Sequence, residues 1–247
     1  SFFLEAVGGC VLLLVQSLRH LPALPRQAGR VVDYGFQMGV QTFPIVALMS
    51  FFLGGVLALQ TGFSLGAVAG LEGVVGKIVG LAQARELGPL MAAFLLAGRV
   101  GSAITAELAS MRVNQEVDAL VTMHIPPVKI LVMPRIVAIL LLMPAIAVGA
   151  IFVGWFGGMV IANHVNFINL DPAIFWSNLK SVTGFSDVLN GIIKAEVFGL
   201  VVVLIACQQG LSTRGGPREI GYSVTRSVVS SMALILVVDY ILTRVLM

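Results

Sequence analysis

The sequence of 247 residues contains little charge: Asp, Glu, Lys and Arg make up 11% of it, whereas a typical soluble domain has about 25%. Apolar residues make up 58%, and the mean hydropathy is +1.00. Too few polar side chains remain to cover a globule in water, which excludes a soluble enzyme and predicts an integral membrane protein. The net charge of +3 does not indicate nucleic-acid binding, because the basic residues stand at the ends of apolar runs and do not cluster.

Cysteine and histidine are also scarce. Cys10 and Cys207 are far apart in the sequence and are both predicted to lie towards the cytosolic side, so a structural disulfide is not expected. The three histidines, His20, His124 and His164, fall in separate loops without the spacing of metal ligands. We therefore expect neither a metal site nor a cofactor.

A complete phosphate-binding loop is absent as well. The nearest match is GVVGKI at residues 73–78, but Leu71 stands where the motif needs its first glycine, and Ile78 where it needs Ser or Thr. We predict that the chain does not hydrolyse ATP and is not itself an enzyme.

Long apolar runs are abundant, and they predict an all-α integral membrane protein. Residues 2–18 hold an uninterrupted apolar core of about a dozen residues, short of the roughly 20 that cross the hydrocarbon. We predict an N-terminal interfacial helix on the cytosolic leaflet, with a full first span as the alternative. Residues 1–30 would form this helix and a linker, and residues 31–247 a single five-span core. No basic stretch followed by a cleavage site opens the chain, so no signal peptide is expected.

Five transmembrane helices are predicted at residues 34–60, 87–110, 128–161, 188–208 and 223–247. Residues 61–84 are Gly-rich and residues 163–187 are polar, so both are predicted to be outer loops, whereas residues 209–222 form an inner loop. Pro134 and Pro144 are expected to bend the third span, because proline removes an intrahelical hydrogen bond. Lys and Arg favour the inner segments if the N-terminus is cytosolic, which places the C-terminus outside.

Charges within the spans are informative, because each is unfavourable by at least ~2.5 kcal/mol at mid-bilayer. The helical rise puts Lys194 about 9 Å and Asp239 about 12 Å below the outer face, where Arg85 and Glu86 begin the second span. These four are predicted to share one level as a neutral set, either as an ion-pair staple between helices or as part of a substrate site. The other charges in spans are Arg99, Glu107 and Glu196.

Residues 111–123 form a short charged helix between the second and third spans. It mixes Arg112, Glu116 and Asp118 with apolar positions. Its place on the cytosolic side predicts a helix onto which a motor protein docks; a merely solvated face is the alternative.

Several motifs occur in order along the chain: RELGP (85–89), LLAGRVGSAITAEL (95–108), EVDAL (116–120), MPR (133–135), ACQQG (206–210) and LVVDYILT (236–243). In this combination the sequence resembles the MlaE/YrbE permeases of lipid-transporting ABC systems, over nearly the whole chain beyond its N-terminal helix. It departs from the family at residues 114–116, where Thr-Glu-Gln is usual, and at residues 126–127, where Asp-Pro is usual.

The resemblance implies a homodimer in the bacterial inner membrane, with cytosolic ABC ATPase subunits and an outer MCE-domain lipid-binding protein. The substrate would be a phospholipid or related lipid held between the two copies. The resemblance also implies roles for three sets of residues. The charged positions of the outer-side cavity would be Arg85, Glu86, Lys194 and Asp239. The positions lining the lipid cavity would be Leu57, Gln60 and Leu65. The positions coupled to the ATPase would be Arg112, Glu116, Val117, Asp118 and Leu120.

Two other functions are compatible with the residues. A channel or secondary transporter could work without ATP, using Lys194 and Asp239 as a relay. A structural anchor for an outer protein would instead tolerate neutralisation of the buried charges.

Overall fold

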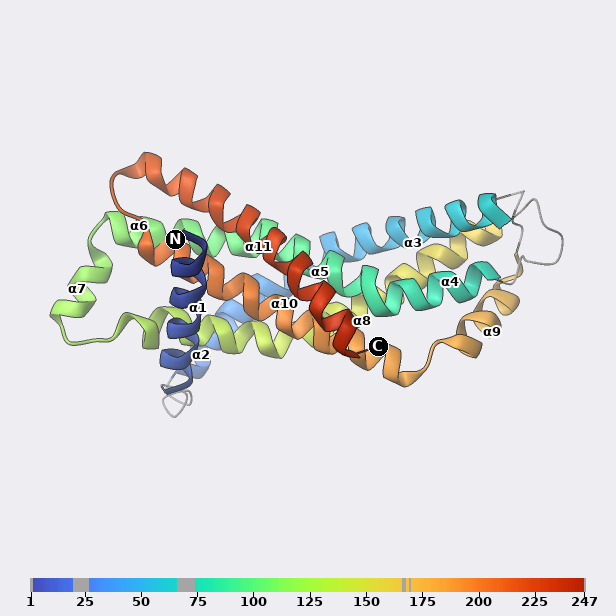
Figure 1. Ribbon diagram of the computed structural model, residues 1–247, viewed down its shortest axis with the longest axis horizontal. Helices are drawn as coiled ribbons and strands as arrows, with labels where there is room; N and C mark the ends of the chain where they lie inside the picture. The colour runs from blue at the N-terminus through green and yellow to red at the C-terminus, as the bar shows by residue number, and fades with distance from the viewer. Residues whose placement is uncertain (1, 20–26, 66–73, 166–167, 169, 247) are drawn as a thin grey trace.

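The computed structural model describes residues 2–19, 27–65, 74–165, 168 and 170–246. Within these residues every regular element is helical, which confirms the all-α class (Figure 1). The elements before the third span are α1 (Phe2–Arg19), α2 (Ala28–Gly35), η2 (Phe36–Val40), α3 (Phe43–Leu65), α4 (Val74–Ala82), η3 (Gln83–Leu87), α5 (Gly88–Leu96), η4 (Ala97–Gly101), α6 (Ser102–Val113) and α7 (Glu116–Thr122). The remaining elements are η5 (Val128–Val132), α8 (Met133–His164), α9 (Pro172–Val182), α10 (Phe185–Ser212) and α11 (Pro217–Leu246).

The labels η mark single π-helical turns that are continuous with the α-helices of long rods. Five such rods are long and apolar enough to cross a membrane, as predicted from the apolar runs. We number these spans in chain order: Ala28–Ser64, Val74–Val113, Val128–His164, Phe185–Ser212 and Pro217–Leu246.

Helix α1 lies across the bundle, whereas the five spans run along its long axis (Figure 1). It contacts α10 and η5. A Cβ added to Gly9 would lie 3.1 Å from Cγ of Gln208, so the small residue permits α1 to approach α10. This crosswise orientation is that of the predicted interfacial helix. The linker that follows lies in part outside the described residues.

The predicted outer loop at residues 61–84 is wrong at both ends. Helix α3 continues to Leu65, and α4 is already helical from Val74, in line with α5; residues 66–73 lie outside the described part. The glycines that suggested a turn serve helix packing instead. A Cβ on Gly76 would lie 2.7 Å from the carbonyl oxygen of Phe175, so α4 and α9 can pack closely only with glycine there. The second span therefore begins at Val74 and not at residue 87.

The other two predicted loops also contain helix. Residues 172–182 of the outer segment form α9, whose first turn is stabilised by Asp171: its Oδ1 accepts a 2.7 Å hydrogen bond from the Ala173 amide. The inner loop is confined to residues 213–216, because α10 runs to Ser212 and α11 starts at Pro217. Helices α9 and α11 both begin with proline, at the first turn, where its missing N–H costs nothing.

The third span is one long rod. Pro134 lies in its first α-helical turn, after η5, and Pro144 lies inside α8. Helix α8 packs most extensively against α3, through Gly54 and Gly157, where an added Cβ on either helix would collide with the backbone of the other.

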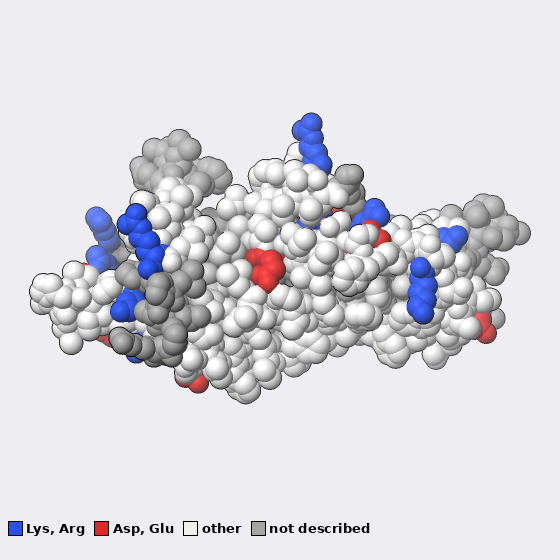
Figure 2. All heavy atoms as spheres, turned by 90° about the horizontal axis from the view of Figure 1, so that it is seen from below, with Lys and Arg blue, Asp and Glu red and all other residues white. Residues whose placement is uncertain are grey.

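The main core lies where α6, α8 and α10 meet, around the fully buried Leu108, Ile139 and Phe198. Span α11 is the least buried of the five. In Figure 2 most of one face is uncharged, as expected for a surface in contact with lipid, and several Lys and Arg side chains gather near the left end.

Candidate functional site

Lys194 is the centre of a buried charge cluster that joins three spans. Its side chain is 3% exposed. Its Nζ lies 2.6 Å from Oε1 of Glu86 and 3.1 Å from Oδ1 of Asp239. It also donates a 2.6 Å hydrogen bond to Oγ1 of Thr243. One ammonium group therefore holds two carboxylates from η3 and α11, and its three donors are all used.

The local helical geometry explains how these side chains meet. Asp239 and Thr243 are four residues apart on α11 and so point from the same face of that helix. Glu86 lies in η3, and the wider π-helical turn changes the direction in which the residues after it point from the helix axis. Glu196 is two residues from Lys194 and does not pair with it; its Oε2 has no hydrogen-bond partner among the described residues.

Arg85 does not belong to the Lys194 cluster, contrary to the predicted neutral set of four. Its Nη2 lies 2.8 Å from Oδ1 of Asp187, and its side chain is 38% exposed. The second Asp187 oxygen accepts a 2.8 Å hydrogen bond from the Gly184 amide at the start of α10. Neighbouring residues on a helix point about 100° apart, so Arg85 and Glu86 reach different partners. Asp187 was not predicted as a site residue, because residues 163–187 were expected to form a loop.

A hollow of about 390 Å³ connects the two groups of charges. It opens where α10 begins and α11 ends, and it is lined by Arg85, Ser186, Asp187, Asn190, Lys194 and Leu246. It thus contains Arg85, which is partly exposed and has one carboxylate partner, beside Lys194, which has two. The structure does not bring Leu57 or Gln60 of α3 into this lining. Leu57 is half-buried and Gln60 is exposed, and the side chain of Leu65 lies outside the described part.

The predicted docking helix is shorter than residues 111–123. α6 extends to Val113, and the chain turns at Gln115, whose φ of 61° is left-handed, before α7 begins. Arg112 pairs with Asp118 across this turn. Val117 is 5% exposed and Leu120 packs on the main core, so these two hold α7 against the bundle and do not offer a surface to a partner. The exposed residues of α7 and its C-terminal end are Glu116, Asp118, Ala119, Val121, Thr122 and Met123.

Comparison of the sequence with known proteins shows to which family the chain belongs. The family of the permease MlaE matches residues 31–245. The chain belongs to the MlaE permease family. A probable ABC transporter permease of Rickettsia typhi is 33% identical over 246 residues, which are 99% of this chain and 93% of the relative. The intermembrane phospholipid transport system permease protein MlaE of Haemophilus influenzae is 33% identical over 245 residues, with 99% and 93% covered.

A plant relative is the chloroplastic protein TRIGALACTOSYLDIACYLGLYCEROL 1 of Arabidopsis thaliana. It is 32% identical over 174 residues, which are 70% of this chain and 49% of that protein. Together the family and these relatives show that this MlaE-family protein is a multi-pass membrane permease subunit of an ABC transporter, and that ATP hydrolysis belongs to a partner subunit.

Proposed function

We propose that this permease moves phospholipid, or a related lipid, between the membrane and an MCE-domain lipid-binding partner on the outer side. The observation that carries the proposal is the hollow at the start of α10, where the partly exposed Arg85 guanidinium faces a space of about 390 Å³. A guanidinium is suited to a phosphate, which it can bind with two parallel hydrogen bonds. The phospholipid transport named for the Haemophilus relative supports this substrate class.

The two cations of the site have different tasks in this proposal. Arg85 is partly exposed and has one acidic partner, so it contacts the headgroup phosphate. Lys194 is almost fully buried between two carboxylates, so it sets the relative positions of η3, α10 and α11. Glu86 and Asp239 hold that ammonium group in place. The hollow falls in the size range of pockets for small ligands, roughly 300–1,000 Å³. It would hold a headgroup, and the acyl chains would lie along Leu57, Gln60 and Leu65 of α3.

A homodimer would complete the cavity. The rest of the chain buries little of the apolar surface of α11. Tyr240 and Val245, close to the hollow, are 70% and 74% exposed. Two copies that face each other through this region would enclose a lipid. Helix α7 and α9 lie at opposite ends of the bundle (Figure 1), so α7 would meet the ATPase in the cytosol while α9 faces outward. This orientation has a cytosolic N-terminus, an outer C-terminus and a place in the bacterial inner membrane.

The mechanism that follows is mechanical. Closure of the ATPase subunits would push on the exposed face of α7, and the buried Val117 would transmit the displacement to the main core. The spans would then compress the outer cavity and transfer lipid to or from the MCE partner.

The test uses the permease reconstituted in proteoliposomes with its ATPase subunits and the MCE partner. Labelled phosphatidylglycerol should transfer to the MCE protein only when ATP is hydrolysed. Arg85→Gln should lower the transfer rate by about tenfold, as expected for loss of a charge-assisted hydrogen bond, and Arg85→Lys should retain part of it. Asp187→Asn is the matched control, because it removes the same ion pair and keeps the cation.

Two results would overturn the proposal. The first is ion flux through the permease without the ATPase, which would favour a relay through Lys194 and Asp239. The second is full lipid transfer by Arg85→Gln, which would remove the headgroup contact from this hollow.

A further inference from the structure

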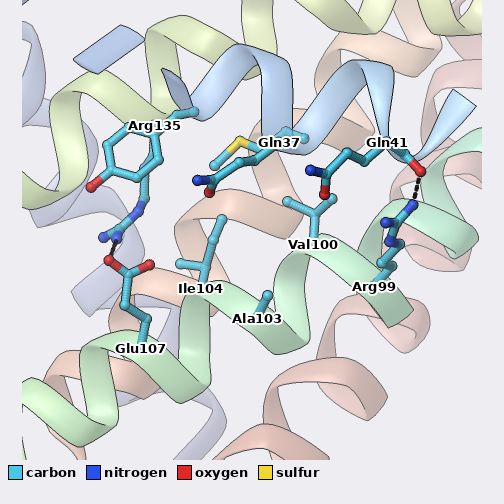
Figure 3. Close-up of a pocket in the computed structure, with 10 residues that line it drawn as sticks. Gln37, Gln41, Arg99, Val100, Ala103, Ile104, Glu107 and Arg135 are labelled. Carbon is cyan, nitrogen blue, oxygen red and sulfur yellow. Dashed lines mark hydrogen bonds and ion pairs between the residues drawn. The ribbon is translucent and has the colours of Figure 1, made fainter. Parts of the chain in front are cut away.

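A second polar groove lies between the start of the first span and the second span, separate from the Lys194 cluster. Its volume is about 270 Å³. Figure 3 shows Gln37 and Gln41 of the first span facing Val100, Ala103 and Ile104 across the groove, with Arg99 at one end and the Glu107–Arg135 pair at the other. Tyr34 and Met38 complete the lining. Two cations and one anion give the groove a formal charge of +1.

Arg135 closes one end of the groove and is unusual for its burial. It is 0% exposed, and its Nη2 lies 2.7 Å from Oε1 of Glu107. Nη1 donates a 2.9 Å hydrogen bond to the Leu131 carbonyl, and the guanidinium stacks on the Tyr34 ring at 4.6 Å. Its Nε has no hydrogen-bond partner among the described residues. A fully buried donor without a partner is energetically unfavourable.

Arg99 occupies the other end and faces outward. Its guanidinium donates to the carbonyl oxygen of Gln41, at the turn between η2 and α3. At this turn the amides of Ile45 and Val46 both donate to the Thr42 carbonyl. Neither amide donates to the Gln41 carbonyl, which accepts its hydrogen bond from Arg99 instead. A guanidinium has five N–H donors, and this contact uses one. An exposed arginine with free donors in a membrane span predicts an anionic partner.

The groove runs inward from the headgroup region: Glu107 lies at headgroup depth, and Arg99 lies about 12 Å deeper along the helix. Val113 ends the second span at the α7 side; Glu107 lies six residues and Arg99 fourteen residues before it, about 9 Å and 21 Å along the helix. The second span has 40 residues, about 60 Å, and therefore projects beyond a bilayer of about 40–45 Å. Helix α1, which lies crosswise like an interfacial helix, contacts η5 directly before the helix that carries Arg135. The groove thus starts near the membrane surface on the α7 side.

The surface beside the groove is apolar. Phe36 and Val40 are 57% and 56% exposed, and they form a stripe next to that of Gln37 and Gln41, each pair being four residues apart. A ligand held in the groove would therefore have a polar, anionic group near Arg99 and an apolar part against Phe36. That combination is the chemistry of a phospholipid.

We propose that this groove binds the headgroup phosphate of a lipid in the leaflet on the α7 side. Arg99 contacts the phosphate, Gln37 supplies an amide donor, and Arg135 is a positioning residue that Glu107 and Tyr34 hold at the end of the groove. The site is distinct from the hollow beside Arg85 and lies towards the other end of the bundle. Its occupancy requires neither ATP nor transport, so it stands or falls separately from the proposed function.

Photocrosslinking in the purified permease complex in maltoside micelles tests this site. Phe36 is replaced by p-benzoylphenylalanine, a similar aromatic group, and the complex is irradiated with dioleoylphosphatidylglycerol or with phosphate-free dioleoylglycerol. Mass spectrometry should find an adduct at residue 36 that is at least about tenfold more abundant with the phospholipid. Arg99→Gln should reduce the phospholipid adduct to the dioleoylglycerol level, and Arg99→Lys should keep part of it.

Arg99→Gln also removes the hydrogen bond to Gln41 and could disturb folding. Gln37→Leu gives a second variant that changes the groove without breaking a described contact, and it should also weaken the phospholipid adduct. Arg218→Gln is the matched control, because Arg218 is an exposed arginine that stacks on Tyr222 away from the groove. It should leave the adduct unchanged.

Three outcomes would overturn the proposal. Equal adducts with both lipids would show contact with bulk lipid only. Binding of inorganic phosphate that depends on Arg99, without a phospholipid adduct, would assign the groove to free phosphate. Crosslinks from residue 36 to a second copy of the chain would make the groove a protein interface.

Discussion

At the scale of single residues, burial separates the charges that build the site from those that can meet a substrate. Lys194 and Arg85 are both cations near the same hollow, but the first is 3% exposed and the second 38%. Removing a buried partner leaves an uncompensated charge, whereas removing an exposed one mainly changes what the surface can bind. Activity and stability should therefore respond differently at the two positions.

Lys194→Met should mainly lower the stability of the protein, and it should affect the contact with lipid less. It would leave Glu86 and Asp239 together without their cation, and breaking a buried pair in this way costs about 3–5 kcal/mol. We expect a lower melting temperature in detergent, measured by the fluorescence of the two tryptophans. Asp239→Asn is the control, because the ammonium keeps Glu86, and its effect should be smaller. Equal melting temperatures for Lys194→Met and the unmodified chain would contradict this role.

The double exchange Lys194→Asp with Asp239→Lys should not restore the site. The new aspartate at position 194 would face Glu86, which lies 2.6 Å from the present ammonium. The structure therefore predicts partial recovery of folding and impaired lipid transfer, measured beside each single variant. Full transfer by the double variant would reduce the cluster to an exchangeable ion-pair staple.

At the scale of elements, α7 combines an anchor and an exposed face within two turns. Val117 points into the main core, while Glu116 and Asp118 on either side are exposed. The helix is only seven residues long, too short to be stable without its packing. Its position between α6 and η5 ties it to two spans at once.

The variant Glu116→Lys with Asp118→Lys should uncouple ATP hydrolysis from lipid transfer and leave the permease folded. Reversal of charge on the exposed face would disturb docking of the ATPase, whereas Val117 would still hold the helix. Hydrolysis and transfer are measured in the same reconstituted complex. Val117→Asp serves as the comparison, since a buried carboxylate should lower the melting temperature itself. Unchanged transfer in the charge-reversed variant would show that α7 does not couple the two subunits.

At the scale of the whole molecule, the two ends of the bundle are built differently. One end carries α7 and the crosswise α1, and the other carries α9 (Figure 1). The hollow lies where α10, the helix after α9, begins. The proposed orientation puts the first of these ends in the cytosol. It can be checked with cysteines at exposed positions of each end.

Ser177→Cys in α9 should react with an impermeant maleimide added outside, and Ser212→Cys at the end of α10 should react only after the membrane is opened. The native cysteines should give little background. Burial raises the pKa of the Cys10 thiol to about 11, so little thiolate is present at pH 7 and its labelling should rise only as the pH approaches that value. Cys207 is buried. Labelling with the opposite sidedness would reverse the proposed topology.

Hydropathy and length determined the fold class, the number of spans and the level of Lys194 and Asp239, because these properties depend on the order of residues along one helix. The ends of the spans were predicted less well. Glycines such as Gly76 suggest a turn from the sequence alone, whereas in the structure they allow close packing against α9. Helix rotation was beyond the sequence. The spans are apolar on nearly every side, so their pattern does not reveal which face is turned inward.

Only the tertiary structure therefore decided that Glu86 reaches Lys194 while Arg85 reaches Asp187. The same holds for the groove at Arg99, whose walls come from residues about 60 positions apart in the sequence, brought together by packing of the first and second spans. Local sequence sets which residues are charged and how deep they lie. The rotation of each helix, set by contacts with all its neighbours, decides which of those charges meet.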